Sequence, residues 1–293
     1  MNLYLKDGTK IEGESFGSKT EVHGEVVFTT GMTGYVESLT DPSFAGQILV
    51  CTFPLVGNYG VPDPKFFESS KMQIAGLVVS EYSETYSHHA AKISLARWLK
   101  DSGVPAITGV DTRALTKKLR EHGVLLGYMG DAKPKTFLDP NAENLVAKVS
   151  PHRRKVYGNG KIRILAIDCG MKENIVRCLT RPETTVIRVP WDHDISKEKY
   201  DALFISNGPG DPTMCQKTIE SIRGAMLANK HILGICLGNQ LLALAAGGST
   251  YKLKYGHRGQ NQPALEAAGH RCYITSQTHG FAVAGPRLPV GWR

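Results

Sequence analysis

A cysteine between two closely spaced glycines is the strongest chemical signal in this sequence. Gly234, Cys236 and Gly238 form a Gly-x-Cys-x-Gly pattern that follows a short apolar run and precedes an amphipathic segment. This order is typical of a nucleophile elbow, a sharp turn from a strand into a helix that exposes a reactive side chain and needs glycines to make room. The N-terminus of the following helix would favour the thiolate. Most cysteines are small buried apolar residues, but this pattern predicts a nucleophile.

A turn-rich segment follows an earlier apolar run, which begins at Ala202. Residues 206–212 read Ser-Asn-Gly-Pro-Gly-Asp-Pro. Its glycines would let backbone N–H groups approach a ligand and could supply one donor of an oxyanion hole, the other being the N–H of Leu237. Alone, the segment would be a weak signal, because Pro and Gly form tight turns readily. It is not a phosphate loop, since neither GxxxxGK(S/T) nor GxGxxG occurs in the chain.

The segments that must position these residues alternate between buried strands and helices. Apolar runs predict strands at 162–167, 185–189, 202–206 and 232–235, and amphipathic patterns predict helices from about 172, over 216–229 and over 240–246. Buried runs separated by helices are typical of βαβ units and a parallel sheet. Ligands in such sheets bind beyond the carboxyl ends of the strands, so both motifs would face one crevice.

The first half of the chain is patterned differently. We expect a hairpin from strands 3–5 and 10–12 and a further strand over 25–30. Two helices should follow, one capped by Ser87 and the other running from Asp111 to Gly123.

These patterns predict an α/β protein with two domains. A mixed α/β domain would occupy residues 1–150, and a mainly parallel-sheet domain would occupy 162–293. The segment 151–161 between them is polar, basic and turn-rich, and is interpreted as a linker.

Composition and charge exclude several functional classes. Apolar residues make up 41% of the 293 residues and charged residues 21%, as in ordinary folded proteins. The net charge of +8 permits an acidic partner. However, the basic residues Lys117, Lys118 and Arg120 have no aromatic residues among them, which favours a solvated helix face over a nucleic-acid site.

Membrane, secretory and metal-binding signals are also missing from the sequence. No apolar run reaches the 18 or so residues of a membrane span, and Lys6 and Asp7 interrupt any signal peptide. We therefore expect a protein of the cytoplasm, or of an organelle matrix if a leader has been removed. The six cysteines form no CxxC pair, so neither a zinc site nor a redox pair is predicted.

Further motifs throughout the chain resemble one family. Besides the two described above, they are residues 24–28, 31–35, 40–43, 57–60, 109–113, 256–263 and 275–282. Together they resemble the small subunit of carbamoyl-phosphate synthetase, its glutamine amidotransferase half, from Met1 to Arg293. The N-terminal domain is peculiar to this subunit, whereas many class I amidotransferases share the cysteine motif. The pattern looks closest to the fused eukaryotic enzymes of the pyrimidine pathway, in which this unit begins a longer chain.

The resemblance implies a reaction and a set of partners. Cys236 would attack the side-chain amide of L-glutamine, form a thioester and release ammonia, which a synthetase partner combines with bicarbonate and ATP. No cofactor or metal is expected in this chain, because ATP and Mg would bind to the partner, either a large subunit or fused synthetase domains. The resemblance assigns glutamine binding to Ser43, Gly208, Gly210, Leu237, Gln240, Thr278, Gly280 and Phe281.

The chain departs from the family pattern at three places. The family usually has His at the position of Asn239 and Asn at that of Thr278. Its catalytic His and Glu lie in a His-Pro-Glu motif beyond the segment 279–283, and this motif occurs nowhere in the sequence. Thioester hydrolysis needs general acid/base help worth roughly 10²–10⁴-fold, so we expect a C-terminally truncated, impaired glutaminase. His279 could act as a substitute base.

Three functions therefore compete. The first is the amidotransferase unit of a carbamoyl-phosphate synthetase, which could serve either pyrimidine or arginine synthesis. The second is a catalytically impaired amidotransferase-like module that binds and regulates a synthetase. The third is a general thiol hydrolase using Cys236 and His279, which lacks a recognisable acidic residue to orient the histidine.

Overall fold

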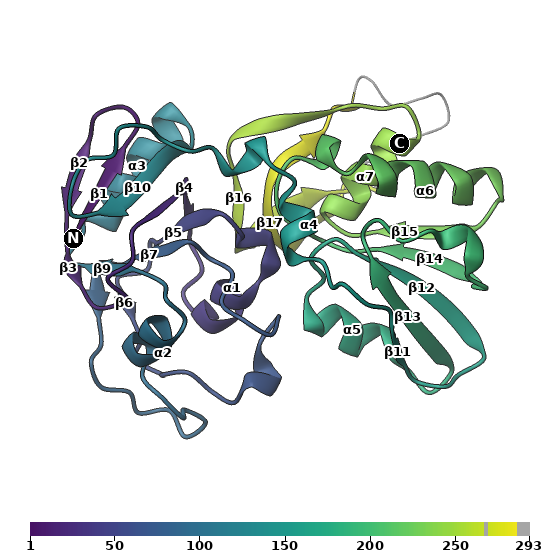
Figure 1. Cartoon of the computed structure of the whole chain (residues 1–293), viewed down its shortest axis with the longest axis horizontal. Coiled ribbons are helices and arrows are strands. Elements are labelled where there is room, and N and C mark those ends of the chain that lie inside the picture. The colour runs from purple at the N-terminus through teal and green to yellow at the C-terminus, as the bar shows by residue number, and fades with distance from the viewer. Residues whose placement is uncertain (267–268, 286–293) are drawn as a thin grey trace. The chain divides into compact units, whose positions relative to one another are not determined.

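The computed structural model describes residues 1–266 and 269–285 (Figure 1). Two compact units follow from the contacts within the chain. Unit 1 comprises Met1–Ala142 and Lys254–Thr278, and unit 2 comprises Glu143–Leu253 and the described residues 279–285. Each unit has its own central sheet and hydrophobic core.

Unit 1 is built on an eight-stranded mixed sheet with the order β2-β1-β10-β4-β5-β7-β9-β3. Its strands are β1 (Asn2–Leu5), β2 (Lys10–Glu12), β3 (Glu14–Ser15), β4 (Val22–Thr29), β5 (Gln47–Cys51), β7 (Gly76–Val78), β9 (Ala106–Thr108) and β10 (Leu125–Gly130). β4, β5, β7 and β9 run parallel, whereas the strands at both edges are antiparallel. The short strands β6 (Leu55–Val56) and β8 (Glu81–Tyr82) form a separate pair.

Helices cover both faces of the unit 1 sheet. One face packs against α1 (Tyr35–Thr40) and α2 (Leu95–Asp101), and the other packs against α3 (Thr112–His122). The predicted hairpin is confirmed by the antiparallel pairing of β1 with β2. The predicted helix from Asp111 to Gly123 is confirmed as well, because the Asp111 side chain caps α3 by accepting from the Ala114 N–H at 2.8 Å.

The predicted cap of α2 is wrong. The helix begins at Leu95, where the Ser94 hydroxyl accepts from the Arg97 N–H at 3.3 Å. Ser87 does not start a helix because the chain after it is drawn into an extended bridge between Ile93 and Val61. A long-range pairing therefore decides between two serines that look equally suitable as caps.

Unit 2 is built on a five-stranded sheet with the order β11-β13-β12-β14-β15. Its strands are β11 (Lys155–Tyr157), β12 (Ile162–Asp168), β13 (Thr184–Pro190), β14 (Ala202–Ile205) and β15 (His231–Gly234). All neighbours except β11 are parallel. The mainly parallel sheet predicted from the apolar runs is thus confirmed.

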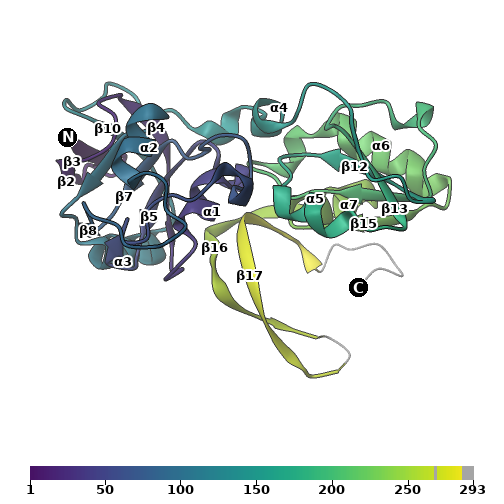
Figure 2. The same cartoon turned by 90° about the horizontal axis from the view of Figure 1, so that it is seen from below.

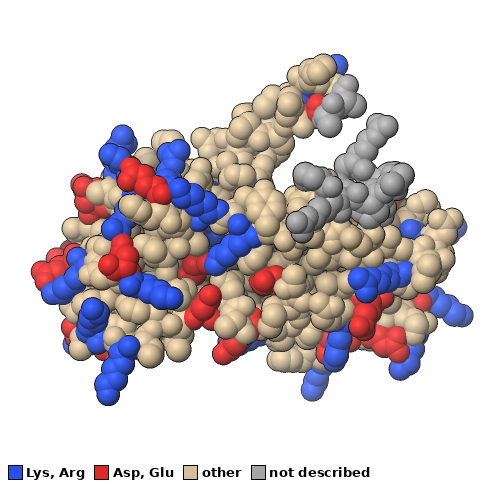
Figure 3. All heavy atoms as spheres, turned by 90° about the horizontal axis from the view of Figure 1, so that it is seen from above, with Lys and Arg blue, Asp and Glu red and all other residues tan. Residues whose placement is uncertain are grey.

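Helices lie on both faces of the unit 2 sheet. α6 (Gln216–Leu227) and α7 (Leu237–Ala245) pack on one face together with α4 (Leu145–Val149), and α5 (Glu173–Leu179) packs on the other. None of the described helices is long and apolar enough to cross a membrane. Acidic side chains lie among the basic ones on the face drawn in Figure 3.

The segment predicted as a linker, residues 151–161, contains β11. This strand pairs antiparallel with β13, with Val156 opposite Ile187, so the segment forms an edge of the unit 2 sheet rather than a free connector. The boundary between the units falls earlier, after Ala142.

A long two-stranded ribbon formed by β16 (Thr250–Leu265) and β17 (Cys272–Val283) follows α7 (Figure 2). Most of it, residues 254–278, belongs to unit 1 by its contacts. Within unit 1, the Val124 N–H donates to the Lys254 carbonyl and the Thr30 N–H to the Arg258 carbonyl. The domain bounds 162–293 stay a prediction.

Candidate active site

Cys236 lies on the turn that joins β15 to α7. It is the N-cap of α7, which begins at Leu237, three residues after β15 ends at Gly234. Its backbone has φ 54° and ψ −110°, a conformation that costs a residue with a Cβ about 1–3 kcal/mol and persists only where the surroundings enforce it. The residue is half-buried. The predicted strand-to-helix elbow is confirmed, and it presents a thiol at the positive end of a helix.

The two glycines that flank the cysteine are required by space. A Cβ on Gly234 would lie 2.5 Å from the carbonyl carbon and oxygen of Gly238. A Cβ on Gly238 would lie 2.2 Å from the carbonyl oxygen of Ile205, at the end of β14. Neither position has room for any other residue, so the glycines allow α7 to start directly against the sheet.

Gly208 and Leu237, the two predicted oxyanion donors, lie side by side. A Cβ on Gly208 would be 2.7 Å from Cδ2 of Leu237 and 2.1 Å from the carbonyl oxygen of Cys169. Leu237 is the first residue of α7, where N–H groups have no acceptor within the helix. Gly210, in the same turn as Gly208, has φ 81° and packs against Leu145. The carboxyl end of β14 is therefore held closely against the start of α7.

β17 contributes three more of the predicted residues to unit 2. The Gln240 side chain, on α7, is buried and donates from Nε2 to the Phe281 carbonyl at 2.7 Å. The Gln240 N–H donates to the Cys236 carbonyl at 3.2 Å. Nδ1 of His279 lies 2.7 Å from the same Phe281 oxygen, with Gly280 between the two residues. Because a carbonyl only accepts, Nδ1 carries the proton, and a neutral imidazole then has its lone pair on Nε2.

A buried polar network lies at the end of β12. The Asp168 carboxylate is 1% exposed, and its Oδ2 accepts from Nε of Arg188 at 2.5 Å. Its Oδ1 accepts from the N–H groups of Gly170 and Met171 at 2.8 and 2.6 Å. Burial raises the pKa of Asp168, while the Arg188 guanidinium and the two N–H groups oppose that rise. Glu173 accepts from Nη1 of Arg188 at 2.6 Å.

The sequence prediction missed this network, although a signal for it exists. Asp168 directly follows an apolar run, as do the segments at 206–212 and 234–238. The rule that ligands bind at the carboxyl ends of parallel strands would have included it.

Comparison with known families matches both halves of the chain. Residues 3–129 match the family described as carbamoyl-phosphate synthase small chain, CPSase domain, and residues 165–293 match class-I glutamine amidotransferases. The chain joins a carbamoyl-phosphate synthase small-chain domain to a class-I glutamine amidotransferase domain. The resemblance found in the sequence is thus confirmed, and Cys236 lies in the amidotransferase match.

Known relatives align with essentially the whole chain. The multifunctional protein URA2 of Saccharomyces cerevisiae is 47% identical over 100% of the chain and 15% of its own length. The multifunctional protein CAD of Squalus acanthias is 48% identical over 99% of the chain and 14% of its own length. The human mitochondrial carbamoyl-phosphate synthase (ammonia) is 43% identical over 100% of the chain and 20% of its own length. The chain therefore spans between about a seventh and a fifth of these relatives.

Two predicted glutamine-binding residues belong to unit 1. Ser43 lies in a short 3-10 helix (Pro42–Phe44) that follows α1, is 8% exposed, and donates its N–H to Oδ1 of Asp41 at 2.9 Å. Thr278, on β17, is the last residue of unit 1. The role of both residues in binding glutamine stays a prediction.

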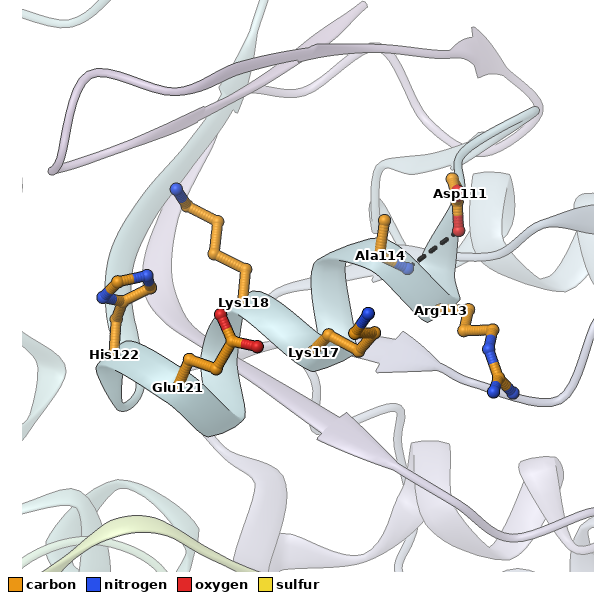
Figure 4. Close-up of a pocket in the computed structure, with 7 residues that line it drawn as sticks. All are labelled: Asp111, Arg113, Ala114, Lys117, Lys118, Glu121 and His122. Carbon is orange, nitrogen blue, oxygen red and sulfur yellow. Dashed lines mark hydrogen bonds between the residues drawn. The ribbon is translucent and has the colours of Figure 1, made fainter.

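The small-chain domain has a surface hollow along α3 (Figure 4). Its lining includes Arg113, Lys117, Lys118 and His122 on the polar side of the helix. Lys118 pairs with Asp7 at 2.8 Å, and the guanidinium of Arg120 lies 6.0 Å from the ring centre of Tyr255. Lys117 and Arg120 are exposed and Lys118 is half-buried, which supports the interpretation as a solvated helix face. The hollow lies in the unit that does not contain Cys236.

A further hollow, between α6 and the 3-10 helix Ile195–Lys197, also lacks Cys236. No group of three or more His, Cys, Asp or Glu residues suited to a metal ion occurs within 1–266 and 269–285. The elbow at Cys236 is accordingly the candidate active site.

Proposed function

We propose that this chain hydrolyses glutamine and supplies ammonia to a carbamoyl-phosphate synthetase partner. The Cys236 thiolate attacks the carbon of the glutamine side-chain amide and forms a tetrahedral oxyanion. The C–N bond then breaks, the nitrogen takes up a proton and leaves as ammonia, and a thioester remains on Sγ. Water next attacks the thioester, which releases glutamate and returns the free thiol.

The position of Cys236 carries this proposal. The residue stands at the N-terminus of α7 in a strained conformation, with φ 54°, and it is half-buried. The family match to class-I glutamine amidotransferases over 165–293 supports glutamine as the substrate. A helix N-terminus lowers the pKa of a thiol, and the turn exposes it to a substrate.

The neighbouring residues have defined roles in this proposal. Gly208 and Leu237 donate their N–H groups to the oxyanion. Gly210, Gln240, Gly280 and Phe281 line the glutamine site, and Ser43 and Thr278 complete it. His279 is the candidate base, acting through Nε2 because Nδ1 donates to the Phe281 carbonyl.

The small-chain match and the length of the relatives support a synthetase partner. The chain covers 15% of URA2 and 20% of the human carbamoyl-phosphate synthase (ammonia). We propose that synthetase domains, in the same polypeptide or in a separate subunit, use the ammonia with bicarbonate and ATP. ATP and Mg would bind to that partner and not to this chain. The cytoplasmic location expected from the sequence stays a prediction.

A second candidate is a catalytically impaired module that binds glutamine and regulates a synthetase. The 293 residues contain no His-Pro-Glu motif. The intact elbow at Cys236 argues against this candidate, since a binding module has no need of a strained thiol.

Covalent labelling separates the two candidates. The 293-residue chain is incubated with the diazo ketone analogue of glutamine, and in parallel with glutamine itself. Glutaminase chemistry predicts that the analogue labels Cys236, that glutamine yields a covalent glutamyl adduct visible by mass spectrometry, and that ammonia is released slowly. Binding of glutamine without label, adduct or ammonia would support the regulatory module. A general thiol hydrolase would instead cleave unrelated amides and esters at similar rates.

A further inference from the structure

The buried network at the end of β12 is joined directly to the turn that holds Gly208. The Ser206 hydroxyl, fully buried, accepts from the Cys169 N–H at 2.9 Å and donates to the Asn207 carbonyl at 2.7 Å. The Lys172 N–H donates to Oδ1 of Asn207 at 3.2 Å. The chain after β12 is therefore bound to the chain after β14 at two points, Cys169 to Ser206 and Lys172 to Asn207.

Asp168 fixes the shape of the first of these turns. Its carboxylate receives the N–H groups of Gly170 and Met171, and Arg188 on β13 holds its other oxygen. The Ser150 hydroxyl donates to the Asp168 carbonyl at 2.6 Å and accepts from the Trp191 N–H at 3.0 Å. The turn is thus anchored to β13 through both its side chain and its backbone.

The anchored turn at 168–171 limits where Gly208 can lie. The carbonyl oxygen of Cys169 stands 2.1 Å from the place of a Gly208 Cβ, and Leu237 stands 2.7 Å from it on the other side. Gly208 is therefore in close contact with both the anchored turn and the first residue of α7. A displacement of Cys169 would therefore change the position of the Gly208 N–H.

Stability alone is a poor reason for such a network. A buried ion pair seldom contributes net stability, because the cost of removing two charges from water offsets their attraction, but it restricts the chain to one arrangement. We propose that Asp168, held by Arg188 and coupled through Ser206, is a positioning residue for the oxyanion site at Gly208. This inference rests on the proposed glutaminase function.

Two probes of the same thiol test the proposal in the full 293-residue chain. The carbonyl of the diazo ketone analogue takes the place of the glutamine carbonyl, so its reaction uses the oxyanion donors. Alkylation by iodoacetamide uses only the thiolate. Peptide mass spectrometry reads Cys236 separately from the exposed residues Cys178 and Cys272.

The variants are Asp168→Asn and Ser206→Ala, with Glu198→Gln as a matched control. Glu198 is also a largely buried carboxylate in unit 2, paired with Arg154 and His193 at 3.1 Å each, but it makes no contact with the turn at 168–171 among the hydrogen bonds of the described residues. We expect Asp168→Asn and Ser206→Ala to slow saturating analogue labelling by about tenfold or more, by analogy with the loss of an oxyanion donor. The rate of iodoacetamide labelling should stay within about twofold of the wild-type rate, because alkylation does not use the oxyanion donors.

Several results would overturn the proposal. Unchanged analogue labelling in Asp168→Asn, equal slowing of both probes, or equal slowing in Glu198→Gln would show a structural role only. If Asp168→Asn lacks a cooperative thermal transition, Ser206→Ala decides the question, by the ratio of its analogue-labelling rate to its iodoacetamide-labelling rate. A wild-type chain that reacts with iodoacetamide but not with the analogue would refute the glutaminase function, and the positioning role with it.

Discussion

Two helices of the amidotransferase domain begin at a cysteine, and the two cysteines differ in burial and in backbone conformation. Cys215 is the N-cap of α6, has φ −99°, and is fully buried. Burial raises the pKa of its thiol to about 12. Cys236 is the N-cap of α7, has φ 54°, and is half-buried. A helix N-terminus is therefore not sufficient for a reactive thiol, because exposure and backbone conformation decide whether a substrate can reach it.

Glycines explain why the start of α7 at Cys236 differs from the start of α6 at Cys215. The elbow at Cys236 is flanked by two glycines whose missing side chains let α7 start against β14. α6 instead begins after the 3-10 helix Pro212–Met214, and Cys215 turns into the core beside Ile219. Since the two helices lie in one domain and on one face of the sheet, each serves as an internal control for the other.

The largest effect is expected from removing the nucleophile. Cys236→Ser should abolish thioester formation and ammonia release, because an alcohol without a strong neighbouring base is a far weaker nucleophile. Cys215→Ser should retain labelling by the glutamine analogue. Steady-state ammonia release and adduct mass are the measurements, and undiminished turnover in Cys236→Ser would exclude it as the nucleophile.

The pH dependence of alkylation should differ by orders of magnitude between the two thiols. With a pKa of about 12, Cys215 carries roughly one thiolate in 10⁴ molecules at pH 8, and burial hinders access further. It should stay unlabelled by iodoacetamide until the pH rises toward 12 or the chain unfolds, whereas Cys236 reacts in the folded protein at neutral pH. Equal labelling of both at pH 8 under native conditions would remove the distinction.

Filling the space beside the elbow should have the next largest effect. In Gly238→Ala the new methyl group would meet the Ile205 carbonyl at 2.2 Å, so the start of α7 must shift. We expect the rate of analogue labelling to fall by at least about tenfold, since misplaced catalytic groups can cost 10²-fold. A wild-type rate in this variant would show that α7 can move without loss of the site.

A smaller effect tests the glutamine-binding role predicted for Ser43. Ser43→Ala should raise the KM for glutamine with little change in kcat, because a neutral hydrogen bond present in both ground and transition states contributes about 0.5–1.5 kcal/mol. That range corresponds to roughly 2- to 13-fold in KM. A KM within error of the wild-type value would show that Ser43 does not contribute to glutamine binding.

The smallest effect is expected at Gly224 in α6, which is the counterpart of Gly238 in α7. A Cβ on Gly224, in the middle of α6, would have no atom within 4 Å. Gly224→Ala should raise the free energy of unfolding by about 0.5–1 kcal/mol through helix propensity alone. Activity should be unchanged, and a chemical denaturation curve measures the gain. A loss of stability would mean that the glycine has a structural role that its surroundings do not reveal.

Local signals predicted most of this fold, and long-range contacts account for the errors. The elbow, the parallel strands and the cap at Asp111 are each encoded within a few neighbouring residues. The start of α2 depended on the bridge between Val61 and Ile93, which no local pattern reveals. The partnership of Asp168 with Arg188 likewise requires the parallel pairing of β12 with β13, which brings side chains 20 residues apart into contact.

Because the backbone at Cys236 is strained, selection for stability and selection for activity favour different residues at this position. With φ 54° and ψ −110°, the position suits glycine, which adopts such conformations without steric penalty. Cys236→Gly would therefore relieve strain and stabilise the fold while deleting the thiol. A library selected for heat resistance alone should accumulate that substitution, and a library selected for ammonia release should never do so. The elbow is a point where thermostability and activity are in direct trade-off.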